Sequence, residues 1–270
     1  MTDYVAVPVT FTDDTCHPLS LATDDPDGFL DADVAALVEI AEMLGAIVEL
    51  QSARRIARQL MDTYVGRRTG ARVVAGQIAR GSYEAIHAVI WYANLRGFTA
   101  LTDTLSRGDV MELLEDWFDI VGAALAVEGG EILKFVGDAA LAIFEVNSEG
   151  GAAERCAAAR RAAAEVSAGV TARNHRRRAN GRVPIGFGIA LDIGEVAYGN
   201  IGTADRLDFT VIGPAVNHAA RLQGLAADLG RMIVTSEAFA DTVPDALSAL
   251  GTFALRGVSG MQRAFAPDEA

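Results

Sequence analysis

The chain has 270 residues, with 23 Lys and Arg against 36 Asp and Glu, so its formal net charge at pH 7 is −13. Hydrophobic residues make up 51% and charged residues 22%, which indicates a globular protein and excludes a disordered one. The acidic balance argues against nonspecific nucleic-acid binding, which needs clustered Lys and Arg, but it leaves a phosphorylated small substrate open.

The first 30 residues are predicted to form a short hairpin. Apolar residues alternate from Tyr4 to Thr12, Asp13-Asp14 marks a turn, and Pro18 to Thr23 supplies the return strand. Because two strands cannot bury a core alone, the hairpin either packs on another element or ends a domain that begins outside this sequence.

Residues 31–64 are predicted to form one long helix, with Asp31 or Asp33 as its N-cap. Apolar residues recur at spacings of three and four, first in one seam and then, beyond Gln51, in a second: Val34, Leu37, Ala41, Leu44 and Val48, followed by Ile56, Leu60 and Tyr64. Such seams are typical either of a helix that packs on its own domain or of a parallel coiled coil that leads into a dimeric domain. Contact with a second chain distinguishes the two.

Residues 65–83 contain Gly and Arg at intervals and are interpreted as a connector. From about Glu84 onward, strands and helices alternate irregularly, which favours an α+β sandwich over a doubly wound parallel sheet. The expected strands cover 87–92, 131–136, 139–146, 183–191, 196–201, 206–212, 232–235 and 252–255, and the expected helices cover 107–127, 152–170 and 216–229.

Some conspicuous residues receive no functional role. The basic run Arg173–Arg178 is expected on an exposed helix end or loop, and His87 and His218 are isolated. Trp91 and Trp117 are predicted to lie in the core.

The two cysteines, Cys16 and Cys156, lie far apart without metal-ligand spacing, so we expect reduced thiols. No apolar run reaches the ~18 residues of a membrane-spanning helix, and the start lacks the basic segment of a signal peptide. We therefore expect a cytoplasmic protein.

Two short clusters combine a turn with residues that suit phosphate chemistry. In Tyr92–Thr99, a strand runs into a Gly turn that opens a helix, and such a junction presents backbone N–H groups to an anion. In Lys134–Asp138, Gly137 permits a tight turn and Asp138 stands at the hairpin tip. Lys134 interrupts an apolar strand and needs a partner or a ligand, because an unpaired buried ammonium is costly.

A third cluster extends from Asp208 to Leu222. Asn217 and Arg221 are four residues apart and therefore lie on one helical face. Asn supplies a neutral donor and acceptor, and Arg supplies a fixed-charge fork for phosphate oxygens. Each cluster by itself is also typical of an ordinary turn, a hairpin tip or a solvated helix surface.

Together the three clusters resemble the catalytic domain of class III nucleotidyl cyclases. The family patterns Phe-x-Asp-Ile-x-Gly-Phe-Thr, Lys-x-x-Gly-Asp and Val-Asn-x-Ala-x-Arg-Leu correspond, in the same order, to Tyr92–Thr99, Lys134–Asp138 and Val216–Leu222. Gly188–Gly199 is similar to the family's strand pair before the third pattern, and Leu255-Arg256-Gly257 to its closing element.

The resemblance covers about residues 84–265 and implies an α+β domain with ferredoxin-like topology, an antiparallel-rich sheet with packed helices, over 84–270. The region before it is similar, more weakly, to the tail of a GAF-type sensor domain at 1–30 and to a signalling helix with its connector at 31–83.

The resemblance implies an adenylate cyclase, which converts ATP to 3′,5′-cyclic AMP and pyrophosphate when the ribose 3′-hydroxyl attacks the α-phosphate. In the family, two Mg²⁺ or Mn²⁺ ions per site assist this step. Each site lies between the two subunits of a homodimer, so the expected partners are ATP and a second copy, with no nucleic acid and no membrane segment.

The resemblance also implies a role for individual residues. Asp138, Asn94 and the backbone carbonyl of Leu95 correspond to metal ligands. Lys134 and Thr210 correspond to the pair that reads adenine. The catalytic residues are Asn217, which orients the ribose, and Arg221, which neutralises charge on the α-phosphate. Further substrate contacts are assigned to Arg256, Gly97, Phe98 and Thr99.

Asn94 departs from the family pattern, which has a metal-binding aspartate at this position. A neutral amide offers one good oxygen where a carboxylate offers two charged ones, so we expect nucleotide binding to be retained and turnover to be reduced. The alternative is an inactive, nucleotide-binding and dimerising pseudo-cyclase. The related diguanylate cyclases are excluded, because Gly129-Gly130 is followed by only one acidic residue, Glu131.

Overall fold

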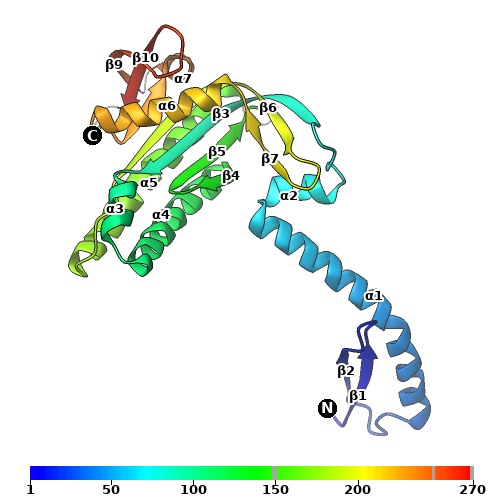
Figure 1. The fold of residues 1–270 in the computed structure, drawn as a ribbon. Helices are drawn as coiled ribbons and strands as arrows, with labels where there is room; N and C mark the ends of the chain where they lie inside the picture. Colours follow the sequence, from blue (N-terminus) through cyan, green and yellow to red (C-terminus); the bar gives the residue numbers. More distant parts are fainter. Residues whose placement is uncertain (148–150, 245–246, 268–270) are drawn as a thin grey trace. The chain divides into compact units, whose positions relative to one another are not determined.

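The computed structural model describes residues 1–147, 151–244 and 247–267, and the chain divides into two units, 1–64 and 65–270 (Figure 1). In the first unit, β1 (Asp3–Thr10) and β2 (Cys16–Thr23) form the predicted antiparallel hairpin, and α1 (Asp31–Tyr64) is the predicted long helix. No helix in the described part of the chain is long and apolar enough to cross a membrane.

The start of α1 differs from the prediction. The carbonyl of Leu30 accepts the first helical hydrogen bond, from Val34, so Leu30 holds the N-cap position. Asp33 lies in the first turn, and its Oδ2 accepts the Leu30 backbone N–H at 2.9 Å. An aspartate at the N-cap was therefore the wrong prediction, because Asp33 caps the helix from inside its first turn.

The hairpin covers the first part of the predicted α1 seam. Val7, Val9 and Ala41 form a small buried cluster, and Leu37 packs against it. Further along the helix, Ile56, Leu60 and Tyr64 are exposed. Packing within the unit therefore accounts for Leu37 and Ala41 of the first seam, and a coiled coil stays a prediction for the rest of the helix. The GAF-like origin of the hairpin also stays a prediction.

The second unit is built on a mixed sheet of eight strands. Their order is β4-β5-β3-β6-β8-β10-β9, with β7 paired to β6. The strands are β3 (Tyr83–Leu95), β4 (Glu131–Val136), β5 (Ala139–Glu145), β6 (Phe187–Gly202), β7 (Leu207–Ile212), β8 (Ile233–Ser236), β9 (Leu247–Ala254) and β10 (Met261–Pro267). Among the described strands the β6–β8 pair is parallel and the other pairs are antiparallel, which confirms the predicted α+β class.

Two expected strands around Gly194 are one continuous strand, β6. The register with β3 runs without interruption through the pair Ala88 and Gly194. A Cβ at position 194 would lie 3.1 Å from the Cβ of Ala215. This glycine therefore lets a helix approach the sheet and does not mark a turn. The sequence prediction also missed β10.

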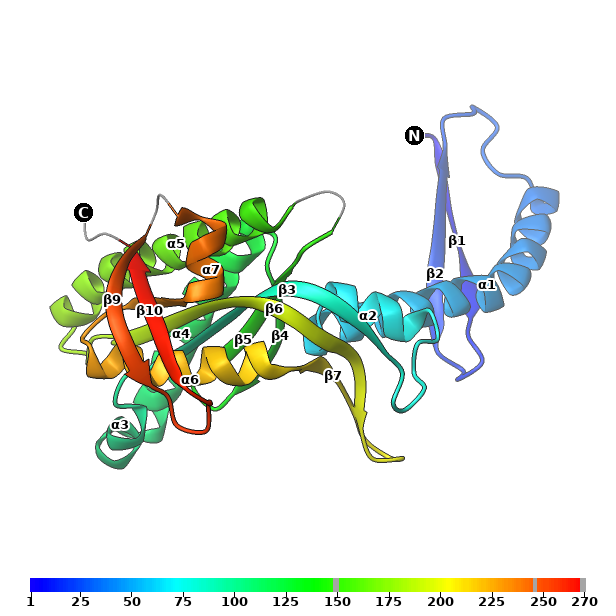
Figure 2. The same cartoon turned by 90° about the horizontal axis from the view of Figure 1, so that it is seen from above.

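Helices cover both faces of this sheet (Figures 1 and 2). They are α2 (Arg67–Val74), α3 (Phe98–Thr104), α4 (Arg107–Glu128), α5 (Ala152–Ala179), α6 (Pro214–Asp228) and α7 (Glu237–Thr242). Alternate β3 residues separate the two cores: Val89 and Trp91 pack with α4 and α5, and Ala88 and Ile90 with α6. Trp91 and Trp117 are fully buried, which confirms their predicted place in the core.

The basic run at 173–178 forms the last turns of α5 and is not wholly exposed. Asn174 is buried, and its side chain bonds to both the backbone N–H and the carbonyl of Ile185. Arg177 is also buried and pairs with Asp116 on α4. An exposed position was the wrong prediction for these two residues, because they join α5 to the following loop and to α4.

The interpretation of 65–83 as a plain connector missed α2, which a buried polar network holds on the sheet. The Thr69 backbone N–H and hydroxyl lie 3.2 and 3.0 Å from Glu131 Oε1, and the Tyr198 hydroxyl donates to the same oxygen at 3.2 Å. Burial raises the pKa of Tyr198, so the phenol stays a donor at neutral pH. Arg72 lies over the Tyr198 ring, 4.8 Å from its centroid.

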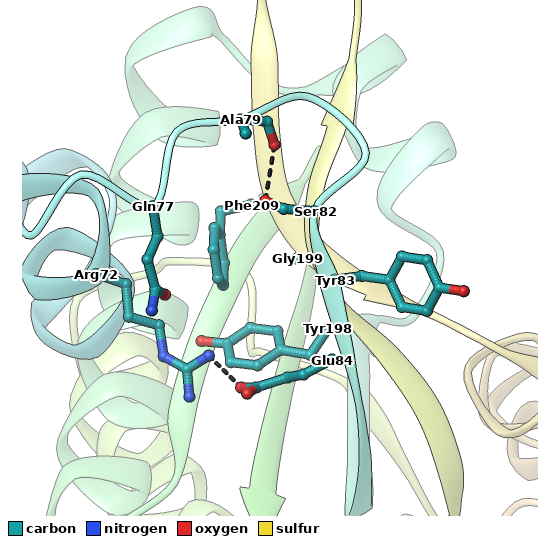
Figure 3. Close-up of a pocket in the computed structure, with 9 residues that line it drawn as sticks. All are labelled: Arg72, Gln77, Ala79, Ser82, Tyr83, Glu84, Tyr198, Gly199 and Phe209. Carbon is teal, nitrogen blue, oxygen red and sulfur yellow. Dashed lines mark hydrogen bonds and ion pairs between the residues drawn. The ribbon is translucent and has the colours of Figure 1, made fainter.

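Beside this network lies a cavity of about 260 Å³ lined by α2 and by β3, β6 and β7 (Figure 3). Arg72 bridges its wall by pairing with Glu84 of β3. The contacts of Arg72 at the cavity join α2 to β3 through Glu84 and to β6 through Tyr198.

Tyr198→Phe is expected to lower the free energy of unfolding of the second unit by about 1 kcal/mol, the usual net value of one buried hydrogen bond. Both tryptophans lie in this unit, so urea unfolding followed by tryptophan fluorescence reports on it. Tyr83→Phe is the matched control, because Tyr83 is 70% exposed. Equal unfolding midpoints for both variants would contradict a stabilising role for the network.

Candidate functional site

The β4–β5 turn places Asp138 against the end of β3. Val136 pairs with Ala139, so Gly137 and Asp138 form a two-residue loop, and Gly137 has a φ of 62° that favours glycine. Asp138 Oδ2 accepts the Leu95 backbone N–H at 3.1 Å, and its carbonyl accepts Trp117 Nε1 at 3.1 Å. The predicted metal residues 94, 95 and 138 are thus brought together within one chain.

The carboxyl group of Asp138 is partly buried, and burial raises its pKa despite the hydrogen bond from Leu95. Burial, with the nearby Asp138 charge as the smaller cause, also raises the pKa of Tyr92. The raised pKa of Asp138 reflects incomplete solvation of its negative charge. A bound cation would offset that cost, and acidification would weaken its binding by protonating the carboxylate.

The donors at this position suit a divalent cation. Asp138 offers a carboxylate, Asn94 an amide oxygen and Leu95 a backbone carbonyl, and Mg²⁺ and Mn²⁺ prefer oxygen ligands. Among the described residues no group of three or more His, Cys, Asp or Glu side chains forms a metal cage. Asp138, Asn94 and Leu95 therefore fit a divalent cation whose remaining ligands are phosphate oxygens. Of these three residues, Asp138 alone supplies a negative charge.

Lys134 has the partner that its place in an apolar strand requires. Its Nζ lies 3.0 Å from Oδ2 of Asp208 on β7. Two residues further along β7, Thr210 is 4% exposed, and its hydroxyl has no partner among the described residues. A buried hydroxyl without a partner is costly, so Thr210 is suited to a ligand. Sequence reasoning assigned no role to Asp208.

Asn217 and Arg221 lie on the solvent-facing side of α6. Pro214 occupies the first helical position, where its missing N–H costs nothing. Ala215, Ala219 and Leu222 are buried on the opposite side, while Asn217 and Arg221 are exposed. The predicted pair is therefore presented outward on one helical face. A cavity of about 1240 Å³ adjoins Asn217.

His218 is not isolated, contrary to the prediction. Its Nδ1 lies 2.8 Å from Oδ2 of Asp192 on β6, whose side chain is 5% exposed. The two residues are 26 positions apart, and Asp192 stood in a segment read as a strand, so no local pattern pointed to the pair.

The other predicted substrate residues lie at two turns. Gly97 has a φ of 67° and precedes α3, whose first residue, Phe98, packs against the core, while Thr99 is exposed. Arg256 is exposed in the β9–β10 connection. In the described part of the chain, no hydrogen bond or ion pair joins Asp138 to Lys134, Thr210, Asn217 or Arg221. Their substrate roles stay predictions.

The fold and these clusters match a known family. The model of the adenylate and guanylate cyclase catalytic domain matches residues 81–262, and the chain belongs to this family. Adenylate cyclase 1 of Rhizobium meliloti (strain 1021) is 26% identical over 253 residues, which cover 89% of this chain and 37% of that protein. The chain spans little more than a third of the length of the curated relatives it matches.

Solved structures agree on the fold. The adenylyl cyclase CyaB from P. aeruginosa is 24% identical with a TM-score of 0.63, over 70% of this chain and 97% of that chain. The guanylyl cyclase Cya2 is 23% identical with a TM-score of 0.59, over 68% of this chain and 92% of that one. An adenylyl cyclase and a guanylyl cyclase share this fold, so the fold does not determine whether the substrate is ATP or GTP. That choice depends on the residues of the site.

Proposed function

We propose that this chain is the catalytic part of an adenylate cyclase, which converts ATP to 3′,5′-cyclic AMP and pyrophosphate. The observation that carries the choice of ATP is Lys134 on β4 beside β7, which bears the unpartnered hydroxyl of Thr210. An ammonium donates to N1 of adenine, and a hydroxyl accepts from the exocyclic amine. Guanine has an N–H at N1, so it would set a donor against the ammonium.

In the proposed reaction, the bond between O3′ and the α-phosphorus forms as the bond to pyrophosphate breaks, and the proton of the 3′-hydroxyl passes to solvent. Asn217 orients the ribose, and Arg221 neutralises the charge that develops on the α-phosphate. Asp138, Asn94 and the Leu95 carbonyl would hold Mg²⁺ or Mn²⁺, which would supply positive charge for the phosphates and for the 3′-oxygen. Arg256 and the turn at Gly97 complete the triphosphate contacts.

We propose that the site is completed by a second copy of the chain. Among the residues that the structure describes, no hydrogen bond or ion pair within one chain joins the metal residues to α6 or to the purine pair, and Asn217 and Arg221 face outward. In a two-fold dimer, each copy offers its metal residues to one site and its purine and α6 residues to the other. The exposed Ile56, Leu60 and Tyr64 of α1 support contact between copies.

A nucleotide-binding pseudo-cyclase is the second candidate, and Asn94 is the observation that favours it. Removing one of two metal carboxylates weakens ion binding at the position where the nucleophile is activated. The proposals differ in one outcome: a pseudo-cyclase binds ATP and forms no cyclic nucleotide, whereas a weakened cyclase forms it slowly. A cytoplasmic location also stays a prediction.

Purified protein is expected to form 3′,5′-cyclic AMP from ATP with Mn²⁺ or Mg²⁺, with kcat/KM at least about 100-fold higher than for GTP, because mispaired buried polar groups discriminate strongly. Product is measured by mass spectrometry. Lys134→Met is expected to erase most of this preference, while Arg206→Met, at an exposed position before β7, leaves it unchanged. A preference for GTP would refute the assignment of the purine.

A further inference from the structure

A polar pair joins α6 to the sheet directly beneath the proposed catalytic residues. Asp192 lies on β6, on the face that α6 covers, between Ala190 and Gly194. Its Oδ1 accepts the Ile193 backbone N–H at 2.8 Å, and its Oδ2 lies 2.8 Å from His218 Nδ1. Both partners are largely buried, with 5% and 17% of their side chains exposed.

In the described part of the chain, the other contacts of α6 with the sheet are mostly apolar. The buried residues of the helix are small or aliphatic: Ala215, Ala219, Leu222 and Ala226. Apolar contacts of this kind are non-directional, and Gly194 allows a close approach. At the far end of the helix, Arg96 donates to the Ala226 carbonyl at 3.3 Å. Among the described residues, the pair of Asp192 and His218 is the side-chain hydrogen bond that joins the start of α6 to the sheet.

His218 directly follows Asn217 and stands three residues before Arg221. Side-chain tips lie about 6 Å from a helix axis, so a rotation of about 10° moves them by about 1 Å. A misplacement of that size can cost about 100-fold in rate. A buried carboxylate is also costly unless it is paired. The burial of Asp192 beneath the start of α6 therefore indicates a role for its pairing with His218.

We propose that Asp192 and His218 are positioning residues that set the rotation of α6 and thereby aim Asn217 and Arg221 at the ribose and the α-phosphate. The inference rests on the proposed cyclase function and deepens it. Neither residue touches substrate. Their hydrogen bond acts through the placement of Asn217 and Arg221, so it affects the chemical step more than ATP binding.

The test uses the full chain carrying Asn94→Asp, with ATP and Mn²⁺, and measures kcat, KM and the affinity for 3′-deoxy-ATP, which cannot cyclise. His218→Leu is expected to lower kcat by about 10- to 100-fold and to leave KM and the analogue affinity within about threefold. His218→Asn keeps a donor near the Nδ1 position and is expected to recover most of the rate. His175→Leu, at an exposed histidine on α5, is the matched control.

Asp192→Asn is nearly isosteric, keeps one acceptor oxygen in place of two, and provides the second variant if His218→Leu does not fold. It is expected to lower kcat by about threefold to tenfold with unchanged KM, because a neutral hydrogen bond is weaker than a charged one. A kcat within twofold of the parent in every folded variant of the pair would overturn the proposal, as would a rise in KM with unchanged kcat.

Two companion variants separate this inference from the function on which it rests. If Asn217→Ala and Arg221→Ala abolish turnover while the variants of Asp192 and His218 keep the parental kcat, only the positioning role fails. If the parent forms no cyclic nucleotide from ATP or GTP, the cyclase proposal itself fails. Loss of kcat in His218→Leu without recovery in His218→Asn would indicate a packing role and would also count against positioning.

Discussion

Asn94→Asp is expected to raise the rate of cyclic AMP formation by about 100-fold, which corresponds to about 2.7 kcal/mol of transition-state stabilisation. The substitution adds a second carboxylate beside Asp138, which is held at the end of β3 by the Leu95 N–H. Two carboxylates hold two divalent cations more tightly than one carboxylate and one amide. KM for ATP should change much less, because the effect lies in the transition state.

The measurement is the initial rate at saturating ATP over a range of Mn²⁺ concentrations, where the half-saturating Mn²⁺ concentration should fall. Gln59→Glu adds the same charge at an exposed position of α1 and is the control. An unchanged rate at saturating Mn²⁺ would show that Asn94 does not limit turnover. If neither the parent protein nor Asn94→Asp forms product, the pseudo-cyclase proposal is supported instead.

Co-expression of two inactive variants, Asp138→Ala and Arg221→Ala, is expected to restore about a quarter of the parental activity. Each variant alone should lose almost all turnover, because the first lacks the metal carboxylate of Asp138 and the second lacks the positive charge of Arg221 on α6. Random pairing makes half of the dimers mixed. In a mixed dimer one site carries both defects and the other is intact, provided that each site draws its residues from both copies.

The control is co-expression of Asn217→Ala with Arg221→Ala. Both residues belong to α6, so a mixed dimer has a defect in each site and no activity should return. The experiment is run on the Asn94→Asp background, with differently tagged copies to verify that mixed dimers form. Recovery in the control, or none in the first mixture, would exclude a site shared between copies.

Sequence alone determined the features that depend on neighbours along the chain. Gly137-Asp138 forms the expected tight turn because two residues between paired strands and a positive φ suffice for it. Asn217 and Arg221 share a helical face because helical periodicity dictates it. The α+β class and the long α1 followed from apolar periodicity, and the family followed from three ordered clusters of this local kind.

Tertiary structure decided the contacts between distant residues. Only the packed sheet shows that Gly194 faces α6 within a continuous strand, that Thr69 and Glu131, 62 positions apart, hold α2, and that Asp192 pairs with His218. Whether a polar side chain is buried, and with what, depends on which elements meet across the sheet. Local periodicity predicts the burial of apolar residues, because any apolar neighbour can cover them. It does not predict the burial of polar residues, because each of them needs a particular partner at hydrogen-bond distance.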